Sequence, residues 1–168
     1  LSVESLGDTS MAERVTELVR RDLDPEHMVL EVTESSATGN GGTALENLAR
    51  LRMKGFGLSI DDFGTGYSNM QQLSRIAFTE LKIDRYFVMH ANKDPTARVI
   101  LESSLKVARK LNIASVAEGV ETRADFDLLS RLQCDMAQGY FIAPPMPFAD
   151  FLAWNRCWTV GDSGSPSG

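Results

Sequence analysis

The stretch Ile60-Asp61-Asp62-Phe63-Gly64-Thr65-Gly66-Tyr67-Ser68 follows the apolar run Leu58-Ser59-Ile60. The apolar run predicts the end of a buried strand, and glycines at alternate positions predict a loop after it. Two adjacent carboxylates, Asp61 and Asp62, therefore stand where a strand ends. Burying both is costly unless a cation or a hydrogen-bond network compensates. The alternative is a solvated acidic turn that caps the strand, and the pair alone fits both interpretations.

Four more short apolar runs predict strands at residues 28–32, 80–84, 113–117 and 136–140. Helical periodicity predicts helices between these strands, and a closing helix at residues 148–154. The predicted helix starts are Asp94 with Pro95, Thr122, and two capping boxes, Ser10 with Glu13 and Thr43 with Glu46.

Each predicted strand ends in polar or charged residues. These are Glu31, Glu34, Asp61, Asp62, Lys82, Asp84, Glu118 and Gln138. Alternating strands and helices predict parallel strands with crossover helices, and functional groups at many strand ends are typical of a TIM barrel. A doubly wound open sheet also accommodates about five strands, but it gathers its ligand groups at one switch point. We therefore expect an α/β fold, a TIM-like barrel whose amino-terminal strands are missing from this chain.

Length and composition bound the remaining possibilities. The 168 residues are enough for one domain or part of one, and the net charge of −6 argues against a nucleic-acid polymer as partner. Cys134 and Cys157 are too few for a disulfide framework or a zinc site. We expect a cytoplasmic domain over residues 1–158, and a flexible or vector-derived tail over residues 159–168.

The strand-end groups have a chemistry in common, because they are mostly carboxylates and include no histidine or thiolate. Such an oxygen-rich site suits Mg²⁺ or Mn²⁺ and not zinc. Two such ions about 3.5–4 Å apart suit in-line phosphoryl chemistry, in which Lys82 could orient water or balance charge on phosphate. Single members also have structural explanations: Glu34 as a helix cap, Lys82 with Asp84 as an ion pair, and Gln138 as a core amide.

Five motifs resemble the EAL domain, the cyclic di-GMP phosphodiesterase family of bacteria. They are Glu31-Val32-Thr33-Glu34-Ser35, Asp61-Asp62-Phe63-Gly64-Thr65-Gly66-Tyr67-Ser68, Leu81-Lys82-Ile83-Asp84, Val116-Ala117-Glu118-Gly119-Val120-Glu121 and Gln138-Gly139-Tyr140-Phe141. The resemblance implies a TIM-like barrel, two Mg²⁺ or Mn²⁺ ions, and hydrolysis of cyclic di-GMP to linear pGpG.

The resemblance also implies roles for individual residues. Glu31, Asp61, Asp62 and Asp84 match metal ligands, Lys82 and Glu118 match catalytic positions, and Gln138 matches a substrate-binding position. Glu34, which we count with the catalytic residues, matches a glutamate that anchors the loop after Asp62, a loop that the family links to metal binding and dimerisation. The family's Glu-Ala-Leu segment, which carries a metal-binding glutamate, is absent from this chain, and so is a metal-binding asparagine.

These matches predict a hydrolase whose partners follow from the family. We expect a homodimer, and an upstream sensory, receiver or GGDEF domain in a parent protein that could be membrane-anchored. The alternatives are an EAL-type receptor that binds cyclic di-GMP without cleaving it, and a structural or dimerisation piece. We expect the chain by itself to be inactive, because a barrel without its first strands has an open edge.

Overall fold

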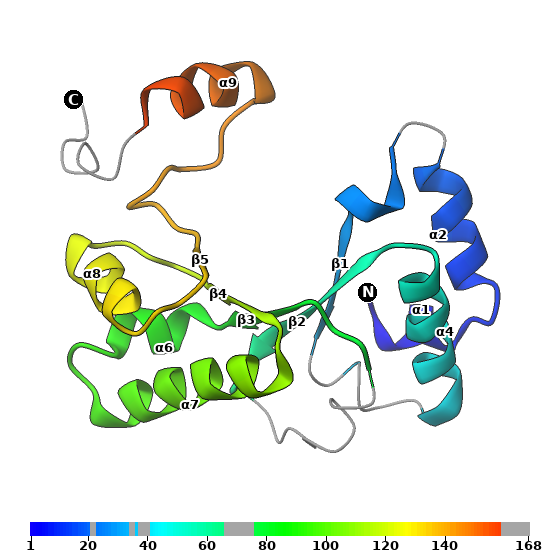
Figure 1. Cartoon of the computed structure of the whole chain (residues 1–168), viewed down its shortest axis with the longest axis horizontal. Helices are drawn as coiled ribbons and strands as arrows, with labels where there is room; N and C mark the ends of the chain where they lie inside the picture. The colour runs from blue at the N-terminus through cyan, green and yellow to red at the C-terminus, as the bar shows by residue number, and fades with distance from the viewer. Residues whose placement is uncertain (21–22, 34–35, 37–40, 66–75, 159–168) are drawn as a thin grey trace.

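The computed structural model describes residues 1–20, 23–33, 36, 41–65 and 76–158. Its centre is a parallel five-stranded sheet in the order β1-β2-β3-β4-β5 (Figure 1). The strands are β1 (Val29–Thr33), β2 (Gly57–Phe63), β3 (Glu80–Ile83), β4 (Ala114–Ala117) and β5 (Met136–Ala137). Strands that neighbour one another in strict chain order form the wall of a barrel, whereas a doubly wound sheet reverses its order. The predicted α/β class is confirmed, and the sheet is part of a TIM-like barrel.

The helices lie in two groups on the sheet (Figure 1). The amino-terminal group near β1 and β2 is α1 (Val3–Gly7), α2 (Met11–Val19), the 3₁₀ turn η1 (Pro25–His27) and α4 (Gly41–Met53). The second group, near β3 to β5, is α6 (Arg85–His90), α7 (Pro95–Leu111) and α8 (Arg123–Arg131). The sequence pattern did not predict α6, because six residues are too few to show a helical period.

Two of the four predicted helix starts are confirmed by their hydrogen bonds. Asp94 is the N-cap of α7, and its side chain accepts a hydrogen bond from the backbone N–H of Thr96. Thr122 forms a capping box with Asp125 at the start of α8. Ser10 is the N-cap of α2, as predicted, but the capping box is wrong, because Ser10 donates its hydroxyl and amide hydrogens to Asp8 instead.

The capping box predicted at Thr43 is also wrong. Helix α4 begins at Gly41, two residues earlier, so Thr43 lies inside the helix and not at its cap. Three strands are also shorter than the sequence pattern predicts, since β3 ends at Ile83, β4 begins at Ala114 and β5 ends at Ala137.

One hydrophobic core lies between the sheet and the helices. Alternate residues of the central strands, among them Leu58, Ile60 and Leu81, are fully buried there. Helix α7 contributes Leu101 and Leu105 from its apolar face. Each such side chain stabilises the fold by about 1.5–3 kcal/mol relative to its exposed state. The other face of the same strands is left to the polar residues of the candidate site.

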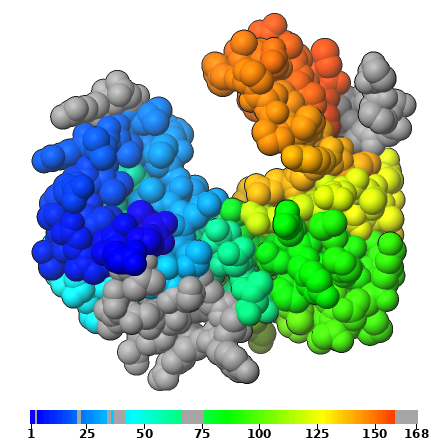
Figure 2. Space-filling view, turned by 180° about the vertical axis from the view of Figure 1, so that it is seen from behind, coloured from blue at the N-terminus to red at the C-terminus, as the bar shows by residue number. Residues whose placement is uncertain are grey.

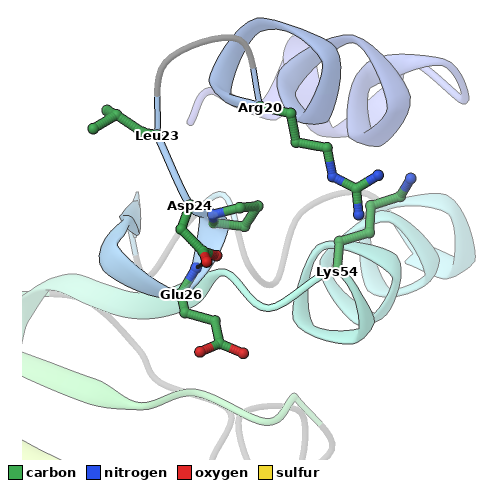
Figure 3. Close-up of a pocket in the computed structure, with 6 residues that line it drawn as sticks. Arg20, Leu23, Asp24, Glu26 and Lys54 are labelled. Atoms are coloured by element: carbon green, nitrogen blue, oxygen red, sulfur yellow. Dashed lines mark hydrogen bonds between the residues drawn. The ribbon is translucent and has the colours of Figure 1, made fainter.

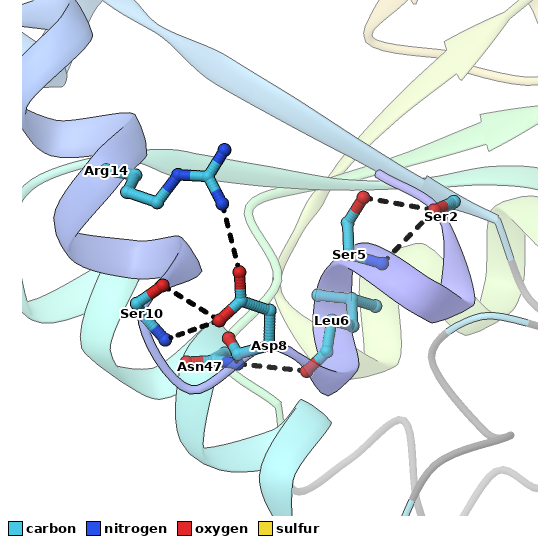
Figure 4. Close-up of polar contacts among 7 residues, drawn as sticks. All are labelled: Ser2, Ser5, Leu6, Asp8, Ser10, Arg14 and Asn47. Carbon is cyan, nitrogen blue, oxygen red and sulfur yellow. Dashed lines mark hydrogen bonds and ion pairs between the residues drawn. The ribbon is translucent and has the colours of Figure 1, made fainter.

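A buried amide joins the first helix to α4 (Figure 4). Asn47 of α4 is 1% exposed, and its Nδ2 donates to the backbone oxygens of Leu6 and Asp8, each at 2.9 Å. These two carbonyls end α1, where carbonyl groups lack partners within the helix. Nearby, the Asp8 carboxylate accepts from Ser10 and from the Arg14 guanidinium, which fixes the turn between α1 and α2.

The last helix stands apart from the sheet. Helix α9 (Phe148–Cys157) follows an extended segment, and Figure 2 shows a wide notch between it and the amino-terminal helices. The structure describes all ten residues of α9 and buries none of them. Phe148 is 75% exposed, and Phe151 packs only against Trp154 among the aromatic contacts of the described residues. None of the described helices combines the length and the hydropathy that crossing a membrane requires.

Candidate active site

Lys82 lies at the centre of a charged cluster at the carboxyl edge of the sheet. Its Nζ is 2.6 Å from Glu31 Oε1, 2.7 Å from Glu118 Oε1 and 3.3 Å from Asp61 Oδ1. These carboxylates come from β1, from β2 and from the residue after β4, while Lys82 comes from β3. The parallel order of the strands therefore brings together four residues that are far apart in sequence.

The surroundings of Lys82 keep it charged. Burial of the ammonium by itself favours the neutral form, but the hydrogen bonds to Glu118 and Glu31 and the charge of Asp61 outweigh it. Together they raise the pKa of Lys82 above its usual value. Only 10% of the Lys82 side chain is exposed, so water screens its pairs with Glu118 and Asp61 weakly.

Three carboxylates of this edge are close enough to share a cation. Asp61, Asp62 and Glu118 each offer an oxygen, and these oxygens lie within 4.8 Å of one another. Adjacent residues of a regular strand point to opposite faces. Asp62, however, has a left-handed backbone with φ of 55°, and the register with β3 shifts between Ile60 and Phe63. The chain leaves the regular pleat there, which lets both aspartates join one cluster.

The carboxylates repel one another electrostatically. Burial raises the pKa of Asp62, the negative charges of Asp61, Asp84 and Glu31 raise it further, and Lys82 acts in the opposite direction. Carboxylate oxygens crowded in this way are the ligands that Mg²⁺, Mn²⁺ and Ca²⁺ prefer. The donor set of the described residues thus fits a hard divalent cation.

Gln138 follows β5 and contacts the same cluster through Glu118. Its Nε2 donates to Glu118 Oε1 at 2.8 Å, so Glu118 is held between Gln138 and Lys82. Gln138 also lines a hollow of about 480 Å³ together with Arg85, Glu121 and Tyr140. No pattern in the sequence singles out these three lining residues, although Glu121 and Tyr140 fall within two of the five motifs. Gln138 and Gly119 place the hollow next to Glu118, and it offers space for a ligand.

Asp84 and Glu31 lie at the border of the cluster. The prediction that Asp84 continues the strand is wrong, because β3 ends at Ile83 and Asp84 is the N-cap of α6. Its Oδ1 accepts from the Tyr86 backbone at 2.8 Å, and its other oxygen takes no part in that bond. The Glu31 side chain is about half exposed (54%) and bonds to Lys82. The ion pairs of Lys82 thus connect it to Glu31, Asp61 and Glu118, in place of the structural pair with Asp84 considered above.

Some predicted site residues lie outside the described residues. They are Glu34 and the loop residues Gly66, Tyr67 and Ser68. The pair Ser68 and Gln71 also predicts the start of a short helix, and this helix lies outside the described residues as well. The role of Glu34 as a loop anchor therefore stays a prediction.

A second hollow lies at the amino ends of the strands, opposite the carboxyl ends that carry the carboxylate cluster (Figure 3). Its volume is about 610 Å³, and it is lined by Arg20, Leu23, Asp24, Glu26 and Lys54, with Pro25. The turn η1 and the end of α4 place it before β1 and β2 begin, away from the carboxylate cluster. Active sites of barrel enzymes form at the carboxyl ends of the strands, so this hollow is not the candidate active site.

Comparison with protein families matches residues 1–145 to the EAL domain. The chain belongs to the EAL domain family. Among relatives, the bifunctional diguanylate cyclase/cyclic di-GMP phosphodiesterase MucR of Pseudomonas aeruginosa is 44% identical over 136 residues, which are 81% of this chain and 20% of MucR. The cyclic di-GMP phosphodiesterase RocR of the same organism is 38% identical over 148 residues, 88% of this chain and 38% of RocR. This EAL chain thus spans well under half the length of these curated relatives.

Solved EAL structures share the fold. The complex of the MucR phosphodiesterase with c-di-GMP superimposes with a TM-score of 0.84 at 40% identity, covering 90% of this chain and 62% of that one. A complex of Klebsiella pneumoniae BlrP1 with manganese and cyclic di-GMP gives a TM-score of 0.73 at 30% identity, covering 81% and 35%. The predicted resemblance to the EAL family and its barrel fold are therefore confirmed.

Proposed function

We propose that the EAL domain containing this chain uses divalent metal ions to hydrolyse one phosphodiester bond of cyclic di-GMP, which gives linear pGpG. The observation that carries the proposal is the cluster of Asp61, Asp62 and Glu118 around Lys82. The names of MucR and RocR as cyclic di-GMP phosphodiesterases support the substrate and the reaction.

Asp61, Asp62 and Glu118 are the described residues that would hold a metal ion. Mg²⁺ or Mn²⁺ fits their oxygen donors, and the manganese complex of BlrP1 supports that choice. The family resemblance adds Glu31 and Asp84 as further ligands and a second ion. Bound ions of this kind lower the pKa of water and stabilise charge on entering and leaving phosphate oxygens.

The remaining residues have supporting roles in this proposal. The Lys82 ammonium lies next to the ion ligands, where it can stabilise negative charge that develops on the phosphate. Gln138 holds Glu118 in place and lines the hollow of about 480 Å³, which we propose receives part of the nucleotide. A preformed concave space beside convergent polar groups is the usual form of a ligand site.

Replacing Asp61 by Asn tests this proposal. The change keeps the shape of the side chain and removes the negative charge of Asp61, which pairs with Lys82 and belongs to the carboxylate cluster. With Mn²⁺ and cyclic di-GMP, the full-length protein should lose pGpG release by about 100-fold or more, because a metal site supplies several kcal/mol of charge stabilisation. Product is measured by chromatography and folding by circular dichroism.

Asp127→Asn is the matched control, because Asp127 lies on α8 and pairs with Arg123 away from the site. Wild-type turnover in a folded Asp61→Asn protein would contradict the assignment. Binding of cyclic di-GMP by the wild-type protein without any pGpG release in Mn²⁺ would favour the alternative receptor function.

The family suggests further properties of the parent protein. We propose that it acts in the cytoplasm as a homodimer through the EAL domain, with a sensory, receiver or GGDEF domain before it. The curated relatives support additional domains, since this chain matches only 20% of MucR. Glu34 is proposed to anchor the loop after Asp62 and to support metal binding and dimerisation.

A further inference from the structure

We propose that the ammonium of Lys82 and a divalent ion compete for the same carboxylates, so that Lys82 weakens metal affinity. This role is separate from stabilising charge on phosphate, and it rests on the proposed metal-dependent function. The inference concerns the binding equilibrium of the ion, which can be measured without turnover.

The contacts of Lys82 carry the proposal. Two of its three carboxylate partners, Asp61 and Glu118, are also two of the three members of the cluster that can hold an ion. The third partner, Glu31, lies 2.6 Å from the ammonium and matches a metal ligand of the family. Within the described residues, the lysine therefore pairs with carboxylate groups that an ion would also need.

Electrostatics gives the direction of the effect. Two cations close to one another repel, and the repulsion is strong where burial limits screening by water. The Lys82 side chain is only 10% exposed. A neutral side chain at position 82 removes the repulsion and frees the oxygens of Glu118 and Asp61. Metal affinity should therefore rise when the charge is removed.

The opposite view is that Lys82 only organises the carboxylates. Asp61, Asp62 and Glu118 repel one another, and Lys82 offsets part of that repulsion. If this ordering dominated, removing the ammonium would spread the carboxylates apart and weaken metal binding. The two views predict changes of opposite sign in the same measurement.

The experiment is a Mn²⁺ titration of the full-length protein and four variants. Lys82→Met and Lys82→Gln remove the charge with different side chains, and Lys82→Arg keeps it. Lys110→Met is the matched control, because Lys110 is exposed near the end of α7. Free Mn²⁺ is followed by electron paramagnetic resonance, and the shift in Tm on adding Mn²⁺ gives a second readout.

We expect both neutral variants to bind Mn²⁺ about tenfold more tightly or better than the wild type, and to gain more in Tm from Mn²⁺. Lys82→Arg and Lys110→Met should stay close to the wild type. Equal or weaker Mn²⁺ binding in both neutral variants would overturn the inference. If the wild-type protein binds no Mn²⁺ at all, the proposed function itself fails, so the two failures are distinguishable.

Discussion

At the scale of single residues, backbone conformation decides what the strand ends can present. Asp62 has a left-handed backbone, which costs a non-glycine residue free energy and is tolerated best by Asp and Asn. Gly119, which follows Glu118, has φ of 67° and lies against Arg85 at the start of α6. A Cβ at Gly119 would be 2.5 Å from the Arg85 Cβ, closer than van der Waals contact allows.

Gly119→Ala should therefore destabilise the protein by about 1–3 kcal/mol, from backbone strain and overpacking together. Because Glu118 is the preceding residue, Mn²⁺ affinity should fall as well. Chemical denaturation and Mn²⁺ titration measure the two effects. Gly42→Ala is the matched control, since a Cβ there meets nothing within 4 Å and the position is helical. Equal stability of the two variants would contradict the close approach of Arg85.

At the scale of elements, one side chain that precedes β5 binds this strand to β4 through hydrogen bonds. Asp135 precedes β5, and its Oδ2 accepts from the Ser115 backbone at 2.8 Å and from the Ser115 hydroxyl at 2.6 Å. The Asp135 backbone donates in return to the same hydroxyl at 3.0 Å. This reciprocal set connects β5 to β4, although β5 is only two residues long. It thereby supports the position of Gln138 beside Glu118.

These bonds make the attachment of β5 sensitive to acid. The side-chain and backbone hydrogen bonds from Ser115 lower the pKa of Asp135 below its usual value. The unfolded chain then takes up the proton first as pH falls. The stabilisation is complete above the ordinary Asp pKa and is lost as pH falls through the lowered folded-state pKa. Asp135→Asn should therefore reduce unfolding free energy most at neutral pH and least in acid.

Urea denaturation of the wild type and of Asp135→Asn, repeated from neutral to acidic pH, tests the prediction. Ser115→Ala removes the hydroxyl partner of Asp135. The difference in unfolding free energy between this variant and the wild type should also become smaller as the pH falls. A stability difference that stays constant from neutral to acidic pH would show that the Asp135 charge does not hold β5 in place.

At the scale of the whole molecule, the five-stranded sheet formed by the described residues is open at its two edge strands, β1 and β5. The chain covers 62% of the MucR phosphodiesterase structure that it matches. An open edge leaves backbone groups unpaired, and an open barrel leaves the charged face of the sheet in contact with water. The exposed aromatic side chains of α9 also lack a covering layer among the described residues.

The chain purified by itself should therefore release no detectable pGpG in the presence of Mn²⁺. Joining it to the part of the MucR phosphodiesterase structure that this chain does not cover should restore turnover and raise Tm, because added strands would pair with the open edges of the sheet. Turnover by the isolated chain comparable to that of the joined protein would show that a closed barrel is dispensable.

The amino-acid sequence alone was enough to predict the class of fold and the five strands of the described sheet. Alternating apolar runs and capping residues such as Asp94 and Thr122 are local signals, and local signals survive without a tertiary structure. The runs of carboxylates after strands were likewise sufficient to indicate a hard-cation site, and long motifs such as residues 60–68 indicated the family.

Which of these groups meet depends on the packing of the strands, and no single segment reveals it. The left-handed turn at Asp62 and the register shift beside it place two neighbouring carboxylates in one cluster with Glu118. Lys82 pairs with Glu31, Asp61 and Glu118, whereas Asp84, two residues further on, caps a helix that the pattern did not reveal. The physical reason is that hydrogen-bonded register and backbone turns set distances between strands, and these distances have no signature within any single strand.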